Sequence, residues 1–232
     1  MADGQLLGPV LAPVRALVIG AGPAGLTAAL VLRRSGWHVR LVEEAPRLRT
    51  EGFSVPVHER GQQVLASLLD VPVTRGPVEM SRGDLVRMLA REVGEICFGV
   101  AAETVPHEGW DLVLGADGID SPTRGRLGLD GRRPTGHVLL FPTGEAPGGD
   151  PWRADGIDQI VLPRWSVGNV MLIGDAAAAS GASTGYGTTV ALAMGYEVAT
   201  GMTRGLTLDE IEARLRPWVT EQQAAARRRL RA

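Results

Sequence analysis

The stretch Val14-Arg15-Ala16-Leu17-Val18-Ile19-Gly20-Ala21-Gly22-Pro23-Ala24-Gly25 decides the fold of the first part of the chain. Residues 14–19 suit a buried parallel strand, and residues 26–34 suit a helix. The three glycines between them fit a tight turn, close approach of backbone to a pyrophosphate, and packing of helix on strand. The start of the helix adds free N–H groups, which attract anions. The stretch predicts a dinucleotide-binding βαβ unit.

An acidic pair closes this unit. Residues 38–42 suit a second strand, which runs into Glu43 and Glu44. Glu43 follows Gly25 by 18 positions, close to the spacing of about 20 expected for a carboxylate that binds ribose hydroxyls. A shift of one residue in the strand register would exchange the roles of the two acids, so both are candidates. A turn that only packs a βαβ unit would need neither the acid nor all three glycines.

Composition narrows the function classes. The chain has 232 residues, 44% of them hydrophobic, which is enough for one large or two small domains. Its net charge of −2 gives no reason to expect nucleic acid or an anionic membrane as a partner. All 24 basic residues are arginine, which excludes a Schiff-base lysine and a Walker A lysine. The four histidines show no ligand spacing, so no metal site is predicted.

The ends of the chain predict a cytoplasmic protein. Residues 1–8 lack a basic segment before an apolar core, so we expect no signal peptide. Residues 16–32 are apolar, but the glycine-proline interruption argues against a membrane span. We interpret Arg227-Arg228-Arg229 as the solvated end of the last helix rather than a binding patch.

Further elements follow from local signals. Ser81 with Asp84 predicts the start of a helix through residue 90, and Thr207 with Glu210 forms a capping box for the last helix. Pro217 is expected to kink or split that helix. Two more helices are expected near residues 60–69 and 188–202. Strands are expected near residues 96–100, 111–114, 137–141, 158–162 and 169–173.

Three later motifs identify a family in combination. They are Ser81-Arg82-Gly83-Asp84-Leu85, an apolar strand ending in Asp117-Gly118, and a second apolar strand ending in Gly174-Asp175-Ala176-Ala177 with Gly185-x-Gly187 behind it. Alone, Arg82 would be a surface arginine and Asp117-Gly118 an ordinary turn. Together with the glycine turn, they resemble the FAD-dependent monooxygenases of the p-hydroxybenzoate-hydroxylase type, above all the branch of tetracycline-degrading and polyketide-tailoring oxygenases. The resemblance covers Val14 to about Arg126 and Gln159 to about Arg204.

This resemblance implies an α/β fold, with a Rossmann-like FAD-binding domain of the GR2 flavoprotein type and a reduced β-sheet substrate domain. The FAD-binding domain would comprise residues 1–126 and 155–204, the remnant of the substrate domain residues 127–154, and a C-terminal helix residues 205–232. The cofactor-binding positions that it implies are Gly20, Gly22, Gly25, Glu43, Glu44, Arg49, Arg82, Asp117, Gly174, Asp175, Gly185, Gly187 and Thr188.

The family pattern also gives these positions roles. The three glycines at 20, 22 and 25 take the pyrophosphate and Glu43 the adenosine ribose, while Arg82 reaches the phosphate–ribitol region. Asp175 holds the ribityl chain, and backbone at 185–188 faces the flavin ring. Asp117 belongs to a motif linked to both FAD and NADPH. No catalytic residue is implied, because the flavin carries the chemistry.

Two departures from the family stand out. Only 58 positions separate Asp117 from Asp175, fewer than in typical relatives, which insert a sheet over the flavin there. Many relatives also have a histidine and a proline where this chain has Ala178 and Ala182. Oxygen transfer needs a site shielded from water, so a thin cover predicts an open flavin, or one covered by a second subunit or a partner enzyme.

The sequence therefore predicts an FAD-binding oxidoreductase, an NAD(P)H- and O2-dependent monooxygenase that acts on an aromatic or polyketide-like small molecule in bacterial secondary metabolism. NAD(P)H would bind transiently as the reductant. Two alternatives stay open: a non-redox cyclase or isomerase on the same scaffold, and an inactive accessory protein.

Overall fold

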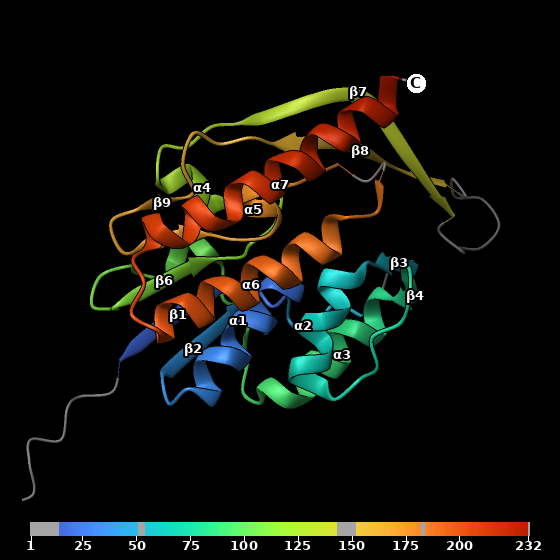
Figure 1. Ribbon diagram of the computed structural model, residues 1–232. Helices are drawn as coiled ribbons and strands as arrows, with labels where there is room; N and C mark the ends of the chain where they lie inside the picture. Colours follow the sequence, from blue (N-terminus) through green and yellow to red (C-terminus); the bar gives the residue numbers. More distant parts are fainter. Residues whose placement is uncertain (1–13, 51–53, 143–151, 182–183, 232) are drawn as a thin grey trace, which may run out of the picture.

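The computed structural model describes residues 14–50, 54–142, 152–181 and 184–231 (Figure 1). Ala182, residues 1–8 and part of the expected substrate-domain remnant lie outside these ranges. The helices are α1 (Pro23–Arg34), α2 (Glu59–Leu69), α3 (Arg82–Val93), α4 (Pro122–Arg126), α5 (Asp175–Ala178), α6 (Gly187–Thr203) and α7 (Leu208–Arg231), with a 3-10 turn at Ala102–Thr104.

A mixed sheet forms the centre of the molecule, in the strand order β5-β2-β1-β6-β10-β9. These strands are β5 (Cys97–Phe98), β2 (His38–Glu43), β1 (Arg15–Ile19), β6 (Leu112–Gly115), β10 (Val170–Leu172) and β9 (Ser166–Val167). All neighbours pair in parallel except β9, which runs antiparallel to β10. The expected α/β fold with a Rossmann-like βαβ start is confirmed.

Side chains on the two faces of β1 belong to two different cores. Ala16 and Val18 join the large core formed with α1, α2, α3, α6 and α7. Leu17 and Ile19 join a smaller core with Val113 and with residues around the 3-10 turn. Successive side chains of a strand point to opposite faces, so the continuous apolar run of β1 reflects burial on both sides, as in other parallel sheets.

Two antiparallel strand pairs lie outside the main sheet: β3 (Ser54–Val57) with β4 (Val78–Ser81), and β7 (Arg132–Pro142) with β8 (Trp152–Ile160). The β3–β4 pair was not predicted, since each strand is four residues long and β3 contains a proline. The predicted strands at 137–141 and 158–162 were wrong in extent. Paired backbone extends β7 back to residue 132 and starts β8 at residue 152, across the Gly, Pro and Arg residues that hid the pattern.

Two helix predictions also need correction. Helix α1 begins at Pro23, three residues earlier than predicted, because proline is favoured in the first turn, where no N–H is needed. Helix α7 contains Pro217 but is not split. Ile211, Leu215 and Val219 are all buried along one face of it, and this packing keeps the helix continuous through the proline.

The C-terminal helix lies along β8 (Figure 1), and its side chains bond to β8 and to the segment after α5. The Gln223 side chain donates from Nε2 to the Ile160 carbonyl at 2.6 Å and to the Ala179 carbonyl at 3.1 Å. Arg227 donates to Oε1 of Gln159 at 2.8 Å. The interpretation of the terminal arginines as a solvated helix end was therefore wrong for Arg227. Within the described ranges, no helix is long and apolar enough to cross a membrane.

Candidate functional site

The glycine turn between β1 and α1 lines a narrow cleft of about 160 Å³. Gly20 has a φ of +104°, and a Cβ there would lie 2.4 Å from the Ala116 carbonyl oxygen. A Cβ on Gly25 would lie 1.9 Å from the Gly20 carbonyl oxygen. Gly22 differs from both, because nothing lies within 4 Å of a Cβ built on it. The first and third glycines therefore make the turn possible, and the second leaves the cleft open.

The Glu43 carboxylate is bonded directly to this turn. Its Oε2 accepts from the Ala21 N–H at 2.8 Å, and its Oε1 accepts from the Ala45 N–H at 3.0 Å. Arg49 lies 3.4 Å from the same Oε1. Glu44 lines the cleft but is exposed. Glu43 is thus the acid that faces the glycines, in the register that the sequence favoured.

Asp117 enters the narrow cleft from the loop between β6 and α4. Its carboxylate accepts from Ser121 Oγ at 2.5 Å and from the Thr123 N–H at 2.9 Å. Ser121 in turn caps α4 by accepting from the Arg124 N–H at 2.9 Å. The carboxylate therefore fixes the loop beside the glycine turn. Buried Arg124, which the sequence analysis missed, ties this loop to α5 by donating to the Ala176 carbonyl at 3.1 Å.

Arg82, the first residue of α3, lines both this narrow cleft and a second, wider one of about 580 Å³. The helix begins as predicted, with Ser81 Oγ accepting from the Asp84 N–H at 3.4 Å. Gly83 permits close packing against the 49–50 segment, since a Cβ there would lie 2.0 Å from the Thr50 carbonyl oxygen. Arg82 thus stands where the two clefts meet.

Asp175 begins α5 and lines the wide cleft. Its side chain is exposed toward the cleft, yet the surrounding protein limits its solvation. This desolvation raises the pKa of the Asp175 carboxyl above its ordinary value, and the charge of Arg82 opposes the shift by a smaller amount. Gly174 before it has a φ of +60°, and a Cβ there would lie 2.9 Å from the Ala24 Cβ, so α5 packs closely on α1.

The start of α6 forms another wall of the wide cleft, with Gly185, Gly187 and Thr188. Gly185 has a φ of +70°, and a Cβ there would lie 2.3 Å from Cγ of Pro56 on β3. The first turn of α6 leaves its N–H groups without intrahelical acceptors. The wide cleft therefore combines a helix N-terminus with the Asp175 carboxylate and the Arg82 guanidinium.

A stacked ring pair stands behind this wall and was missed by the sequence analysis. The His58 and Tyr186 rings are parallel, with centroids 3.7 Å apart. The backbone N–H of His58 also donates to Thr189 Oγ1 at 2.9 Å. Burial lowers the pKa of the His58 imidazole, against smaller raising effects of Thr184 and Glu79. The pair joins the start of α2 to the start of α6, and no local motif in the sequence indicates it.

The structure brings most of the predicted positions together in the two clefts. The narrow cleft is lined by Gly20, Gly22, Glu43, Glu44, Arg49, Arg82 and Asp117, and the wide cleft by Arg82, Asp175, Gly185, Gly187 and Thr188. Gly25 and Gly174 line neither and act through backbone packing. Lining residues that were not predicted include Ile119, Ile157, Asp158 and Arg229. No group of three or more metal-ligating side chains occurs in the part of the chain that the structure describes.

The segment that holds the glycine turn matches a known family model. Residues 18–73 match the family model described as an NAD(P)-binding Rossmann-like domain. A 2-heptyl-3-hydroxy-4(1H)-quinolone synthase of Mycobacteroides abscessus is 31% identical over 56% of this chain and 48% of its own length. A 3-amino-4-hydroxybenzoate 2-monooxygenase of Streptomyces cremeus is 29% identical over 58% and 48%. The chain thus spans about half the length of the curated relatives it matches.

Solved structures share the fold. The tetracycline destructase Tet(51) superimposes with a TM-score of 0.75 at 18% identity, over 96% of this chain and 92% of that one. A 2-methyl-3-hydroxypyridine-5-carboxylic acid oxygenase mutant gives 0.76 at 24% identity, over 93% and 90%. HpxO of Klebsiella pneumoniae, complexed with FAD and uric acid, gives 0.75 at 18% identity, over 94% and 88%. The chain resembles FAD-dependent monooxygenases in sequence and has the fold of the solved flavin monooxygenases.

Proposed function

We propose that the two clefts together hold one FAD molecule. The observation that carries this proposal is Arg82, which lines both clefts and joins them into one elongated site. The ADP half would lie in the narrow cleft and the flavin ring in the wide one. A two-part ligand of this kind needs a cation between the parts, where its phosphates lie.

The narrow cleft has the properties that a pyrophosphate and a ribose require. The open space at Gly22 admits phosphate oxygens beside the first turn of α1, whose free amides favour anions. Glu43 would accept from the adenosine ribose hydroxyls, with Glu44 and Arg49 at the rim. Asp117 would hold the 117–118 loop against the cofactor, and through the same loop influence the approach of NAD(P)H.

The wide cleft suits the ribityl chain and the ring. Asp175 would accept hydrogen bonds from ribityl hydroxyls, and the first turn of α6 would stabilise negative charge on the reduced ring. Apolar side chains of the same cleft, from Val55, Ile119 and Ile157, would exclude water from the ring. When bound, FAD would supply the capacity to accept a hydride from NAD(P)H and to react with O2.

The reaction that we propose is an NAD(P)H- and O2-dependent monooxygenation of an aromatic or polyketide-like compound. The relatives support this class, since their names describe oxygenation of aromatic and heteroaromatic compounds. NAD(P)H belongs to the cytoplasmic pool of reductants, so the cytoplasm is the compartment that we propose. The β7–β8 pair would contribute the substrate side, as the remnant of a substrate domain between the two parts of the FAD-binding domain.

We also propose that a second subunit or a partner enzyme covers the wide cleft. Val138 on β7 is 60% exposed, although it is apolar and belongs to the strand pair beside the cleft. One solved relative is described as tetrameric. Light scattering tests this part of the proposal, because a monomer with full hydroxylating activity would contradict it.

The visible spectrum of the purified chain tests the cofactor, and anaerobic stopped-flow tests the reaction. We expect an oxidised flavin spectrum that NAD(P)H bleaches in the presence of an aromatic substrate. A colourless protein that takes up no added FAD would contradict both parts. If the protein binds flavin but no nicotinamide reduces it, the cofactor assignment would stand and the non-redox isomerase or cyclase would be favoured. The observation that supports this alternative is Ala178, an apolar, buried residue at the end of α5.

A further inference from the structure

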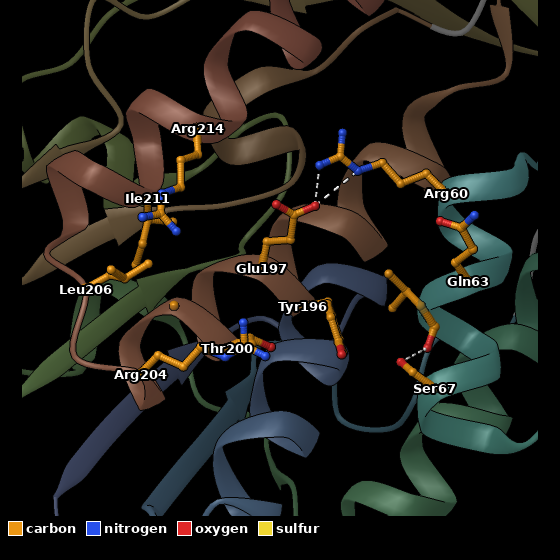
Figure 2. A pocket seen from close by; sticks show the side chains of 12 residues that line it. Arg60, Gln63, Ser67, Tyr196, Glu197, Thr200, Arg204, Leu206, Ile211 and Arg214 are labelled. Carbon is orange, nitrogen blue, oxygen red and sulfur yellow. Dashed lines mark hydrogen bonds and ion pairs between the residues drawn. The ribbon is translucent and has the colours of Figure 1, made fainter.

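A third cavity, of about 430 Å³, lies between α2, α6 and the start of α7 (Figure 2). It shares no lining residue with either of the proposed FAD clefts. Helix α6 separates the two regions: its first turn lines the wide cleft, and its second half, from Tyr196 to Gly201, lines this cavity. The size is within the range of small-molecule sites.

Three guanidinium groups and one carboxylate surround this cavity, from Arg60, Arg204, Arg214 and Glu197. Glu197 is already engaged, because both Nε and Nη2 of Arg60 bond to its Oε1 (Figure 2). Arg60 also lies over the Trp218 ring, 4.0 Å from its centroid. The one carboxylate that lines the cavity is therefore already paired with one of the three arginines.

The other two arginines carry unbalanced charge. Across the described ranges, neither the Arg204 nor the Arg214 side chain forms a hydrogen bond or an ion pair. Arg214 acts electrostatically on Glu210, one turn earlier on the same helix, but the Glu210 carboxylate is already bonded to Thr207. The Thr207 bonds lower the Glu210 pKa more than the Arg214 charge does. Both side chains are exposed at this concave surface, so both are accessible to an anion that they would attract.

The remaining lining adds an apolar floor and neutral hydrogen-bonding groups. Leu206 and Ile211, which lie beside Arg204 and Arg214, supply the apolar floor (Figure 2). Val64 on α2 adds apolar surface, and Gln63, Ser67, Tyr196 and Thr200 supply polar atoms. A bare inorganic ion would use the cations but not the floor. A small organic anion, with a phosphate or carboxylate on an apolar body, would use both.

We propose that this cavity binds a small organic anion, held by Arg204 and Arg214 against the apolar floor. The site does not depend on the proposed FAD binding, because the two regions share no residue. Its position against α6 places a ligand on the same helix whose first turn lines the wide cleft. A bound anion would also compete with Glu197 for Arg60.

Isothermal titration calorimetry with phenyl phosphate and with inorganic phosphate tests this proposal. The full chain carrying Gly22→Trp is used, so that the narrow cleft cannot bind the probe. We expect phenyl phosphate to bind at least about fivefold more tightly than inorganic phosphate, and the Arg204→Ala/Arg214→Ala pair to weaken binding by roughly tenfold or more. The matched control is Arg75→Ala/Arg91→Ala, two exposed arginines outside the cavity, which should leave the affinity unchanged.

Glu197→Gln tests the proposal in the opposite direction, because it should strengthen binding. A misfolded variant would not bind the probe more tightly. It frees Arg60, so phenyl phosphate should bind several-fold more tightly than to the Gly22→Trp parent. The proposal is overturned if the parent shows no binding up to millimolar probe, if the arginine pair leaves the affinity unchanged, or if Glu197→Gln weakens binding. Equal binding of the two probes would overturn the role of the apolar floor, and with it the organic ligand.

Discussion

The narrow and the wide cleft differ in how the chain builds them. The narrow cleft is formed by five local segments, at the ends of β1, β2, β5 and β6 and at the start of α3. Backbone and a few bonded acids dominate it. The wide cleft collects side chains from segments between Pro23 and Arg229, many of them apolar. A site made of backbone leaves little tolerance for change, whereas a site made of many side chains spreads its binding energy over them.

The largest expected effect is therefore a blockage of the narrow cleft. Gly22→Trp places a bulky side chain in the narrow cleft. Of the three glycines of the turn, Gly22 is the one at which a Cβ would meet open space. We expect FAD retention to fall by roughly a thousandfold or more, because the ring occupies the cleft. The measurement is the visible spectrum after gel filtration, with the thermal midpoint as the check on folding.

The control for this blockage is Gly125→Trp. Gly125 is exposed on α4, and a Cβ there also meets nothing within 4 Å, so the same ring enters water instead of the cleft. Retention of flavin by Gly22→Trp at the level of this control would mean that the narrow cleft does not hold the cofactor.

A smaller loss is expected in the wide cleft. Asp175→Ala removes one charged acceptor for the ribityl chain, while the other walls of the cleft remain. We expect the dissociation constant for FAD to rise by roughly 10- to 100-fold. Fluorescence titration of the apoprotein measures it, and Asp130→Ala, at an exposed acid outside both clefts, serves as the comparison. An effect as large as that of Gly22→Trp would show that the wide cleft does not spread its binding energy over many side chains.

A still smaller effect separates the two neighbouring acids. Glu43→Gln keeps an oxygen that can accept from one backbone amide but loses the charge beside Arg49. We expect FAD to bind several-fold more weakly and the free energy of unfolding to fall by about 1 kcal/mol. Glu44→Gln should change neither quantity measurably, since Glu44 is exposed. Titration of both variants, with urea unfolding, decides between them; a larger effect at position 44 would reverse the assignment.

The narrow cleft is built from local turns and the wide cleft from segments far apart in the sequence. This contrast explains which features could be predicted from the sequence. The glycine turn, Glu43 and the Ser81 cap follow from short-range rules, and the structure has them where the motifs put them. The stacking of His58 on Tyr186 joins residues 128 positions apart in the chain, and no local pattern announces it. Arg229 looked like a solvated helix end, yet α7 folds back along β8 and brings it to the wide cleft.

The smallest expected effect is a pH dependence with opposite signs for the apoprotein and for cofactor binding. The pKa of the Asp175 carboxyl is raised in the folded chain, chiefly by desolvation. Between its ordinary value and this raised value, the folded state binds more protons than the unfolded state. The contribution of Asp175 to stability is therefore fully present below the ordinary pKa and is lost as pH rises through the folded pKa.

FAD binding should change in the other direction, because the ionised carboxylate accepts hydrogen bonds from hydroxyls better than the protonated acid does. The wild-type apoprotein should lose thermal stability, relative to Asp175→Asn, as pH rises above the ordinary pKa of an aspartate and through the raised one, while its affinity for FAD rises over the same interval. Asp175→Asn removes the titrating group, so the pH dependence that this carboxyl causes should be absent from both its thermal stability and its affinity for FAD. Thermal midpoints and FAD titrations at matched pH measure them. Parallel curves for the two proteins would mean that the wide cleft solvates Asp175 as fully as bulk water does, and that its walls do not close around the ribityl position.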